Sequence, residues 1–243
     1  MFSFFNKPKE PITLWFSTDI HAHVLPGIDD GSPDTETSMQ LLEGLRECGI
    51  KKVIASPHIT ENTFENNAET IKGAWEALDA AMKSAGMTGI EVAYHAENRI
   101  DALFMCNLKA GELLSLPQNY LLIENSFVQE PLGLDQLIFD LQMKSYLPIM
   151  AHPERFAYYK LDRLKDLHRK ADFQVNLLSL AGFYGKKIRK RVEEMIEARL
   201  VDFIGTDVHN MDHVNAIREY LCSKTAVKDR DLLAKRIKNR IFD

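Results

Sequence analysis

The stretch "TLWFSTDIHAHVLPGIDDG", residues 13–31, is an apolar segment that ends in two histidines and then passes through Pro-Gly into a pair of aspartates. Its first eight residues have the apolar pattern of a buried strand. His21 and His23 stand two positions apart, so their side chains point to the same side of an extended chain. Paired imidazoles and carboxylates in this place indicate a polar site at the carboxyl end of a strand.

The same order, an apolar strand followed by a helical pattern, repeats along the chain. Further strands are expected at residues 50–58, 90–97, 119–125, 147–155, 172–178 and 201–209. Helices are expected at residues 34–49, 64–86, 131–146, 161–170 and 186–200, with two more after residue 209. This alternation predicts an α/β fold with a parallel sheet covered by helices.

The length of 243 residues suits one domain of this kind. We expect a distorted TIM-like (β/α)7 barrel over residues 13–243, preceded by an N-terminal extension over residues 1–12. An open, doubly wound sheet is the alternative. No GxGxxG follows the first strand, so the sequence gives little support to a nucleotide-binding version of that sheet.

Charge and cysteine content narrow the function classes. The formal net charge of −5, with 30 basic and 35 acidic residues, argues against a nucleic-acid-binding protein. The three scattered cysteines, Cys48, Cys106 and Cys222, form no CxxC pair and favour free thiols in a reducing cytoplasm. We recognise no signal peptide and no run of 18 apolar residues, so we expect no membrane insertion.

Polar residues with metal-binding side chains recur where the expected strands end. The set is His21, His23, Asp30, His58, Glu97, Glu124, His152, Asp207 and His209. In a parallel barrel these ends share one rim, so residues distant in sequence converge there. A tetrahedral site takes four ligands, and nine therefore indicate two or three divalent ions that share carboxylates. Nitrogen and oxygen ligands suit Mn, Fe, Co or Zn, with Mn as our first choice.

The remaining histidines, His95, His168 and His213, fall outside this pattern and are expected to be structural or exposed. The loop after the first expected strand holds two adjacent aspartates, Asp29 and Asp30, of which Asp30 is counted in the set.

The motifs "DIHAH", "IDDG", "SPH", "AHPER" and "GTDVH", in this order between about residues 17 and 210, resemble the PHP (polymerase and histidinol phosphatase) family. Within it, "DIHAHVLPGIDDG" and "AHPERF" are most similar to the bacterial capsule-type protein-tyrosine phosphatases of the CpsB/YwqE group. That resemblance implies a distorted βα barrel with up to three metal ions.

The resemblance also implies which residues share an ion. One ion would be held by His21, His23, Glu97 and Asp207, a second by Glu97, Glu124 and His152, and a third by Asp30, His58 and His209. Arg155 matches a family arginine that holds phosphate, which places it in the catalytic set with Asp207 and His209. The family arginine after the final DxH is missing here, because the first arginine after His209 is Arg218. Arg99 is a candidate substrate contact in its place.

The chemistry expected of such a site is hydrolysis of a phosphate monoester by hydroxide held on metal. The preferred substrate is a phosphotyrosine protein, a tyrosine kinase of capsule or exopolysaccharide export. Cysteine-dependent tyrosine phosphatases need Cys-x5-Arg, and none of the three cysteines has an arginine at that spacing. The alternatives are a histidinol phosphatase or other small-molecule phosphatase and, in another class, a non-catalytic PHP-like binding module. The oligomeric state stays open.

Overall fold

The computed structural model describes residues 11–243, and every pairing between its named strands is parallel. The strands are β1 (Thr18–Asp19), β2 (Lys52–Ala55), β3 (His58–Ile59), β4 (Glu91–Tyr94), β5 (Glu97–Arg99), β6 (Tyr120–Glu124), β7 (Leu147–Ala151), β8 (Asp172–Asn176) and β9 (Phe203–Gly205). They form a three-stranded sheet in the order β1-β2-β4 and a six-stranded sheet in the order β3-β5-β6-β7-β8-β9. The expected α/β fold on parallel strands is thus confirmed.

Two chain segments connect the sheets. The segment 52–59 contributes β2 to the smaller sheet and β3 to the larger one, and the segment 91–99 contributes β4 and β5 in the same way. On the other side, a parallel bridge joins Ala22 to Val208, next to hydrogen bonds from His23 N to Val208 O (2.9 Å) and from Asp207 N to His21 O (2.7 Å). The two curled sheets therefore meet just beyond β1 and β9, and residues following these strands lie side by side.

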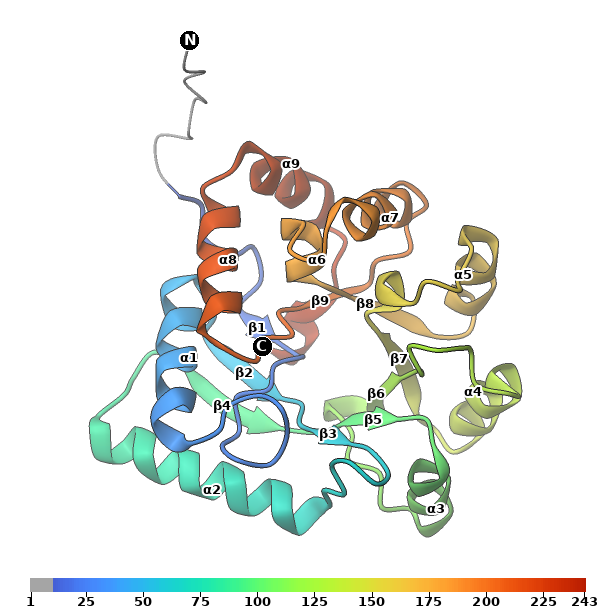
Figure 1. Cartoon of the computed structure of the whole chain (residues 1–243), viewed down its shortest axis with the longest axis horizontal. Coiled ribbons are helices and arrows are strands. Elements are labelled where there is room, and N and C mark those ends of the chain that lie inside the picture. Colours follow the sequence, from blue (N-terminus) through green and yellow to red (C-terminus); the bar gives the residue numbers. More distant parts are fainter. Residues whose placement is uncertain (1–10) are drawn as a thin grey trace.

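The helices lie outside the strands (Figure 1). They are α1 (Thr35–Glu47), α2 (Ala68–Ala85), α3 (Ala102–Ala110), α4 (Leu134–Met143), α5 (Leu161–His168), α6 (Leu177–Ala181), α7 (Lys186–Glu197), α8 (Met211–Leu221) and α9 (Lys224–Leu233). Single turns of 3₁₀ helix occur at η1 (Pro117–Asn119), η2 (Pro153–Arg155) and η3 (Asn239–Phe242). Over residues 11–243, none of these helices is long and apolar enough to cross a membrane.

Local sequence signals account for the helix boundaries. The side chain of Asp34 accepts a hydrogen bond from Thr37 N and starts α1. Asn67 and Thr70 form a capping box at the start of α2, and Gly86 ends that helix with a left-handed φ of 65°. These signals place α1 and α2 within a few residues of the expected helices.

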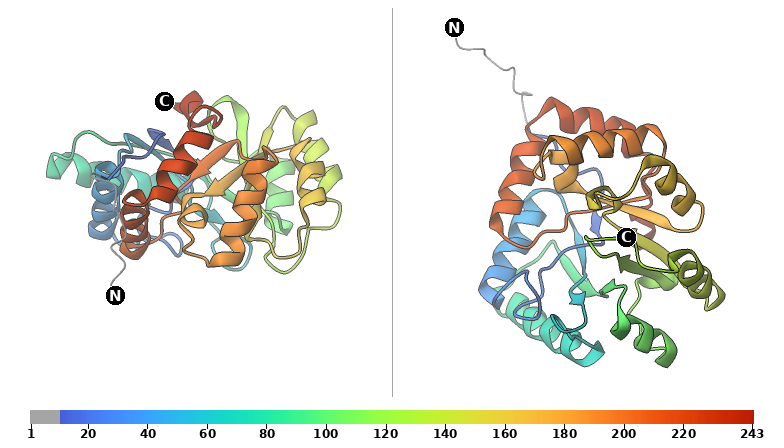
Figure 2. Two further views of the ribbon diagram at one scale, coloured as in Figure 1. Left: turned by 90° about the horizontal axis from the view of Figure 1, so that it is seen from above. Right: turned by 45° about the vertical axis from the view of Figure 1, so that its right-hand side comes forward.

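The C-terminal segment closes the end of the fold at which the strands start. In the left view of Figure 2 the C-terminus lies at the upper edge of the molecule. Asn239 donates to Thr18 O and Ile204 O and accepts from Ile204 N, which ties η3 to β1 and β9. Phe242 is buried in an apolar cluster between the strands. The opposite end, where the strands finish, carries the polar residues described below.

The structure differs from the sequence-based expectations in three places. The first expected strand, residues 13–20, is regular only at β1. The helices α3 and α6 were not expected; α3 is short and apolar and starts at Asp101, which caps Phe104 N, and α6 continues directly from β8. The strands form two sheets rather than one uninterrupted ladder, because the chain breaks after β2 and β4 at residues 56–57 and 95–96.

Candidate metal centre

All nine expected ligand residues converge at the carboxyl end of the strands. His21 and His23 follow β1, Asp207 and His209 follow β9, and His152 follows β7. His58 begins β3, Glu97 begins β5 and Glu124 ends β6. Asp30 lies in the loop between β1 and α1. The structure thus brings these side chains together, and their role as metal ligands stays a prediction.

Glu97 lies at the centre of the cluster. Its Oε2 is 3.2 Å from His21 Nε2, 3.4 Å from His23 Nε2 and 3.2 Å from His58 Nδ1. Its Oε1 is 3.1 Å from His152 Nε2, which is itself 3.7 Å from Glu124 Oε1. A carboxylate with nitrogen ligands around both oxygens is placed to bridge two ions.

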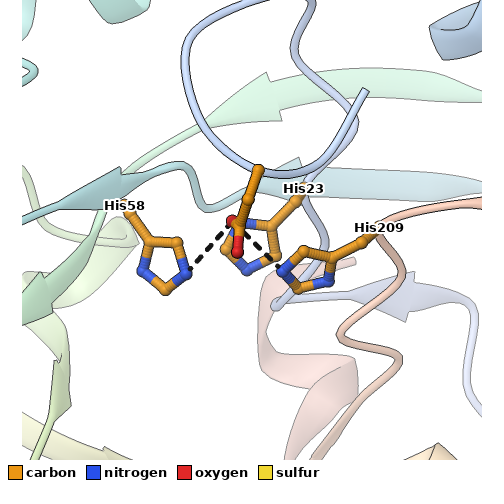
Figure 3. Close-up of side chains that lie close together, drawn as sticks. His23, His58 and His209 are labelled. Atoms are coloured by element: carbon orange, nitrogen blue, oxygen red, sulfur yellow. Dashed lines mark ion pairs between the residues drawn. The ribbon is translucent and has the colours of Figure 1, made fainter. Parts of the chain in front are cut away.

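A second group of side chains gathers beside Asp30. Its Oδ1 is 3.6 Å from His58 Nε2 and 3.5 Å from His209 Nε2. Figure 3 shows the ion pairs that join His58 and His209 to this carboxylate, with His23 beside them. One nitrogen from each of these histidines and one oxygen of Asp30 lie within 4.8 Å of one another, which is compatible with one shared ion. His23 joins this group as well as that of Glu97, because it lies between them.

The outer nitrogens of three histidines are bonded to acceptors, which determines the tautomer. The Nδ1 of His21 donates to Gln174 Oε1 at 2.8 Å and that of His23 to Asp29 Oδ2 at 2.8 Å. The Nδ1 of His209 donates to the backbone oxygen of Asp207 at 2.9 Å. In each ring the Nε2 atom therefore faces the carboxylates and is the nitrogen placed to bind an ion. Asp29 thus lies behind His23, on the side away from the cluster.

Unpaired polar atoms inside the cluster point to a cation. Within the described part of the chain, the buried Glu97 Oε2, His58 Nδ1 and His152 Nδ1 have no hydrogen-bond partner. Buried polar atoms are nearly always paired with protein or water, so such a concentration calls for an explanation. For Glu97 Oε2, which also lies near His21 Nε2 and His23 Nε2, a divalent ion among these ligand atoms supplies one.

The electrostatics of the cluster favour positive charge. Burial acts to lower the pKa of His21, but the carboxylates of Glu97 and Asp207 raise it to about 9. Burial acts to raise the pKa of Glu97, and the charge of His21 is the strongest factor that holds it well below its ordinary value. Burial and then the charge of Glu97 raise the pKa of Glu124 to about 8. A site with this demand for positive charge suits divalent cations.

Two glycines allow the histidines to approach the neighbouring backbone. A Cβ at Gly205 would lie 2.5 Å from His21 Cβ and 2.8 Å from Gln174 Nε2. A Cβ at Gly31 would collide with the Cβ and the backbone oxygen of His23. The glycines of "IDDG" and "IGTD" are therefore required by close packing around His21 and His23.

Backbone strain is concentrated at two residues of the site. His152 has φ of 33° and Asp207 has φ of 53°, in the left-handed region that costs a non-glycine residue about 1–3 kcal/mol. The bond from Asp207 N to His21 O and the burial of both side chains hold these conformations. In these conformations the side chain of His152 faces Glu97, and that of Asp207 faces His21 and His23.

An open pocket of about 400 Å³ lies over the cluster. It is lined by Asp30, His58, Glu97, Glu124, Phe127, His152, Arg155, Tyr184, Asp207, His209, Asn210 and His213. Arg155 enters it from η2 and donates through Nη1 to Asp207 Oδ2 at 2.9 Å. The buried Glu154 accepts from Asn176 N and Ser179 Oγ and so anchors η2 beside β8.

Three residues are placed differently from the expectation. Arg99 was expected beside the substrate, but its Nη1 donates to Glu124 Oε2 at 2.9 Å and it is not part of the pocket lining. His213, expected outside the site, lines the pocket, and its Nδ1 accepts from His209 N at 3.3 Å. Phe127 of the loop after β6 was not singled out from the sequence at all.

The remaining histidines lie away from the pocket. His95 is fully buried, with its Nε2 2.9 Å from Ile20 O, and burial lowers its pKa to about 3. His168 pairs with Asp202 at 2.7 Å near the start of β8 and β9. Both therefore have the structural role expected of them.

Comparison with known proteins gives consistent matches over most of the chain. Tyrosine-protein phosphatase YwqE of Bacillus subtilis is 32% identical over 197 residues, which cover 79% of this chain and 77% of that protein. Putative tyrosine-protein phosphatase CapC of Staphylococcus aureus is 31% identical over 197 residues, with the same coverage. Tyrosine-protein phosphatase CpsB of Streptococcus pneumoniae is 28% identical over 208 residues, covering 80% of this chain and 83% of that protein.

Two solved structures have the same fold as this chain. One of them comes from a study of YwqE from Bacillus subtilis and CpsB from Streptococcus pneumoniae, which it describes as unique metal-dependent tyrosine phosphatases. It superposes on this chain with a TM-score of 0.77 at 29% identity, and the match covers 91% of this chain and 95% of that one. Histidinol phosphate phosphatase of Lactococcus lactis, with a TM-score of 0.52 at 15% identity over 86% of this chain and 93% of that one, shares the fold. The family described as capsular polysaccharide synthesis, CpsB/CapC, matches residues 17–229. With its motifs, its clustered side chains and these relatives in agreement, the chain belongs to the CpsB/CapC family.

Proposed function

We propose that this protein is a metal-dependent protein-tyrosine phosphatase. The observation that carries the proposal is the convergence of nine side chains with nitrogen or oxygen ligand atoms, with Glu97 at the centre. The Nε2 atoms of His21, His23 and His209 are directed into this cluster by hydrogen bonds of their Nδ1 atoms. The relatives named above, which carry the name of tyrosine phosphatase, support it.

The site would hold two or three divalent ions, with Mn as the first choice. The first would bind to His21, His23, Glu97 and Asp207, the second to Glu97, Glu124 and His152, and the third to Asp30, His58 and His209. Such ions supply an activated water and positive charge for the phosphoryl oxygens. Because Arg99 is bonded to Glu124, we reassign it from substrate contact to the orientation of that ligand.

The chain's own contribution to catalysis is positioning and permanent charge. Arg155 is held by Asp207 through one N–H. Within residues 11–243 its other N–H groups have no hydrogen-bond partner, so they can bind phosphoryl oxygens in a forked geometry. Asp207 links this clamp to the ligand cluster, since its other oxygen lies 3.4 Å from His21 Nε2 and 3.4 Å from His23 Nε2. The phosphate would thus be fixed relative to the ions before reaction.

The two curled sheets would act as one distorted, seven-stranded barrel, in which the segments 52–59 and 91–99 each count as one strand. The bridge between Ala22 and Val208 supports this reading. Residues 13–243 would form the catalytic unit and residues 1–12 an extension, of which residues 1–10 lie outside the described part. The substrate would be a phosphotyrosine-bearing kinase of capsule or exopolysaccharide export, encountered in the cytoplasm.

The test is phosphate release from a phosphotyrosyl peptide by the Mn²⁺-loaded protein. His21→Ala should lower the rate of phosphate release more than about a hundredfold, because it removes one ligand from the cluster. His168→Ala, a histidine outside the site, is the matched control and should retain activity. A small phosphomonoester such as histidinol phosphate is assayed in parallel. Unchanged activity in His21→Ala, or a large preference for the small molecule, would overturn the proposal.

A further inference from the structure

The loop between β6 and α4 exposes apolar side chains beside the pocket. Phe127 is 44% exposed, Val128 84% and Leu132 96%. Of these three, Phe127 lines the pocket. Large apolar side chains that are exposed next to a binding site usually serve ligand or partner contact.

Phe127 contacts both halves of the candidate site. Its ring stacks on the ring of His152, with centroids 5.8 Å apart and planes at 20°. The guanidinium carbon of Arg155 lies 4.9 Å from the Phe127 centroid and 4.6 Å from that of Tyr184. The ring therefore lies beside both the ligand cluster and the arginine clamp, while almost half of its surface faces solvent.

The chemistry of the pocket wall makes Phe127 exceptional. Among the lining residues in the described chain, it is the one whose side chain has no polar atom. It has no group that binds an ion or accepts or donates a hydrogen bond to phosphate. Its exposed surface is suited to an apolar part of the ligand, since burial of such surface against another apolar group is favourable.

We propose that Phe127 is a specificity-determining residue that selects phosphate esters of aromatic alcohols by contact with their ring. This inference rests on the proposed phosphatase function. It names Phe127 as the side chain that determines which class of phosphate ester the site prefers. With phosphoryl oxygens at Arg155 and the ligand cluster, the ester oxygen points to the open side of the pocket. The group attached to it then lies along Phe127.

Aromatic pairs in offset or edge-to-face contact are more stable than their buried area alone predicts. A phenyl group gains this contact, whereas a methyl or short alkyl group covers little of the Phe127 surface. The expected discrimination between phenyl and methyl groups is about tenfold in binding.

The test compares two ligands that cannot be hydrolysed, phenylphosphonate and methylphosphonate, by calorimetric titration of the Mn²⁺-loaded protein. The wild type should bind phenylphosphonate about tenfold more tightly. Phe127→Ala should reduce this ratio to about twofold or less, and Phe127→Tyr should restore it because the ring is kept. Leu132→Ala is the matched control from the same loop, outside the pocket lining, and should keep the wild-type ratio.

Equal weakening of both ligands by Phe127→Ala would overturn the inference, because the ring would then act only by holding Arg155 and His152. Absence of a phenyl preference in the wild type would overturn it too. Since binding is measured without turnover, the result is separate from the proposed function: a protein that prefers phenylphosphonate and does not hydrolyse phosphotyrosyl peptides refutes the phosphatase assignment alone.

Discussion

Replacing Asp29 by asparagine tests whether the residues behind the ligands control metal binding. Asp29 Oδ2 accepts from His23 Nδ1 at 2.8 Å and from His58 N at 3.2 Å, while Oδ1 accepts from Gly31 N at 3.0 Å. The side chain of asparagine has only one oxygen, so an NH₂ group replaces either the oxygen that faces His23 or the one that faces Gly31. Facing His23, that donor favours the tautomer with the proton on Nε2, which occupies the lone pair needed for an ion.

The magnitude follows from this tautomer. Loss of an acceptor behind a metal-ligating histidine weakens metal binding by about ten- to a hundredfold, equivalent to about 1.4–2.7 kcal/mol. In the other orientation the NH₂ group faces Gly31, and the hydrogen bond from His23 is kept. That bond then goes to a neutral oxygen instead of a carboxylate, so metal binding is weakened here too. We therefore expect a shift in metal affinity, with kcat largely recovered at saturating metal.

The assay is activity as a function of Mn²⁺ concentration, together with direct titration of the metal-free protein. Asp34→Asn is the matched control, because it makes the same chemical change in the same loop at the N-cap of α1, where asparagine is an equally good cap. An apparent Mn²⁺ dissociation constant of Asp29→Asn within about threefold of the wild type would refute the reasoning.

Three further changes probe the packing and charge around the site. Gly205→Ala should displace His21 and weaken Mn²⁺ binding by at least about tenfold, whereas Gly73→Ala on the exposed face of α2 should leave metal binding unchanged, as titration will show. Asn239→Ala should lower the free energy of unfolding in urea by about 2–4 kcal/mol, because three buried hydrogen bonds to the backbone of β1 and β9 are lost. Burial raises the pKa of Glu154 from 4.5 to about 7, so over that interval the folded protein holds a proton that the unfolded chain releases. The contribution of Glu154 to the free energy of unfolding should therefore fall as pH rises through this interval, and Glu154→Gln should make the slope of stability against pH less steep than in the wild type. Equal slopes in the two proteins would contradict the assignment.

Much of the site could be predicted because it follows a simple geometric rule. His21 with His23, and Asp207 with His209, stand two residues apart at the ends of apolar segments, and parallel strands bring such ends to one edge. Neither observation requires knowledge of the side-chain packing. The expected ligands therefore converge even though the strands themselves are shorter and more broken than expected.

The residues that sequence reasoning missed depend on the turns between elements. His213 is the third residue of α8. It reaches the pocket because Asn210, the residue after His209, caps that helix by accepting a hydrogen bond from His213 N. A capping residue beside a strand-end ligand was an available signal. No comparable signal exists for Phe127, whose loop position is determined by packing on His152 and Phe156. The left-handed backbone of His152 likewise depends on tertiary contacts.

The most direct test of the central claim is phosphate release from a phosphotyrosyl peptide before and after removal of metal, with metal content measured on the same samples. We predict at least two Mn²⁺ ions per chain in the active protein, loss of activity on chelation and recovery on addition of Mn²⁺. Full activity in chelated protein that holds less than one ion per chain would contradict the account.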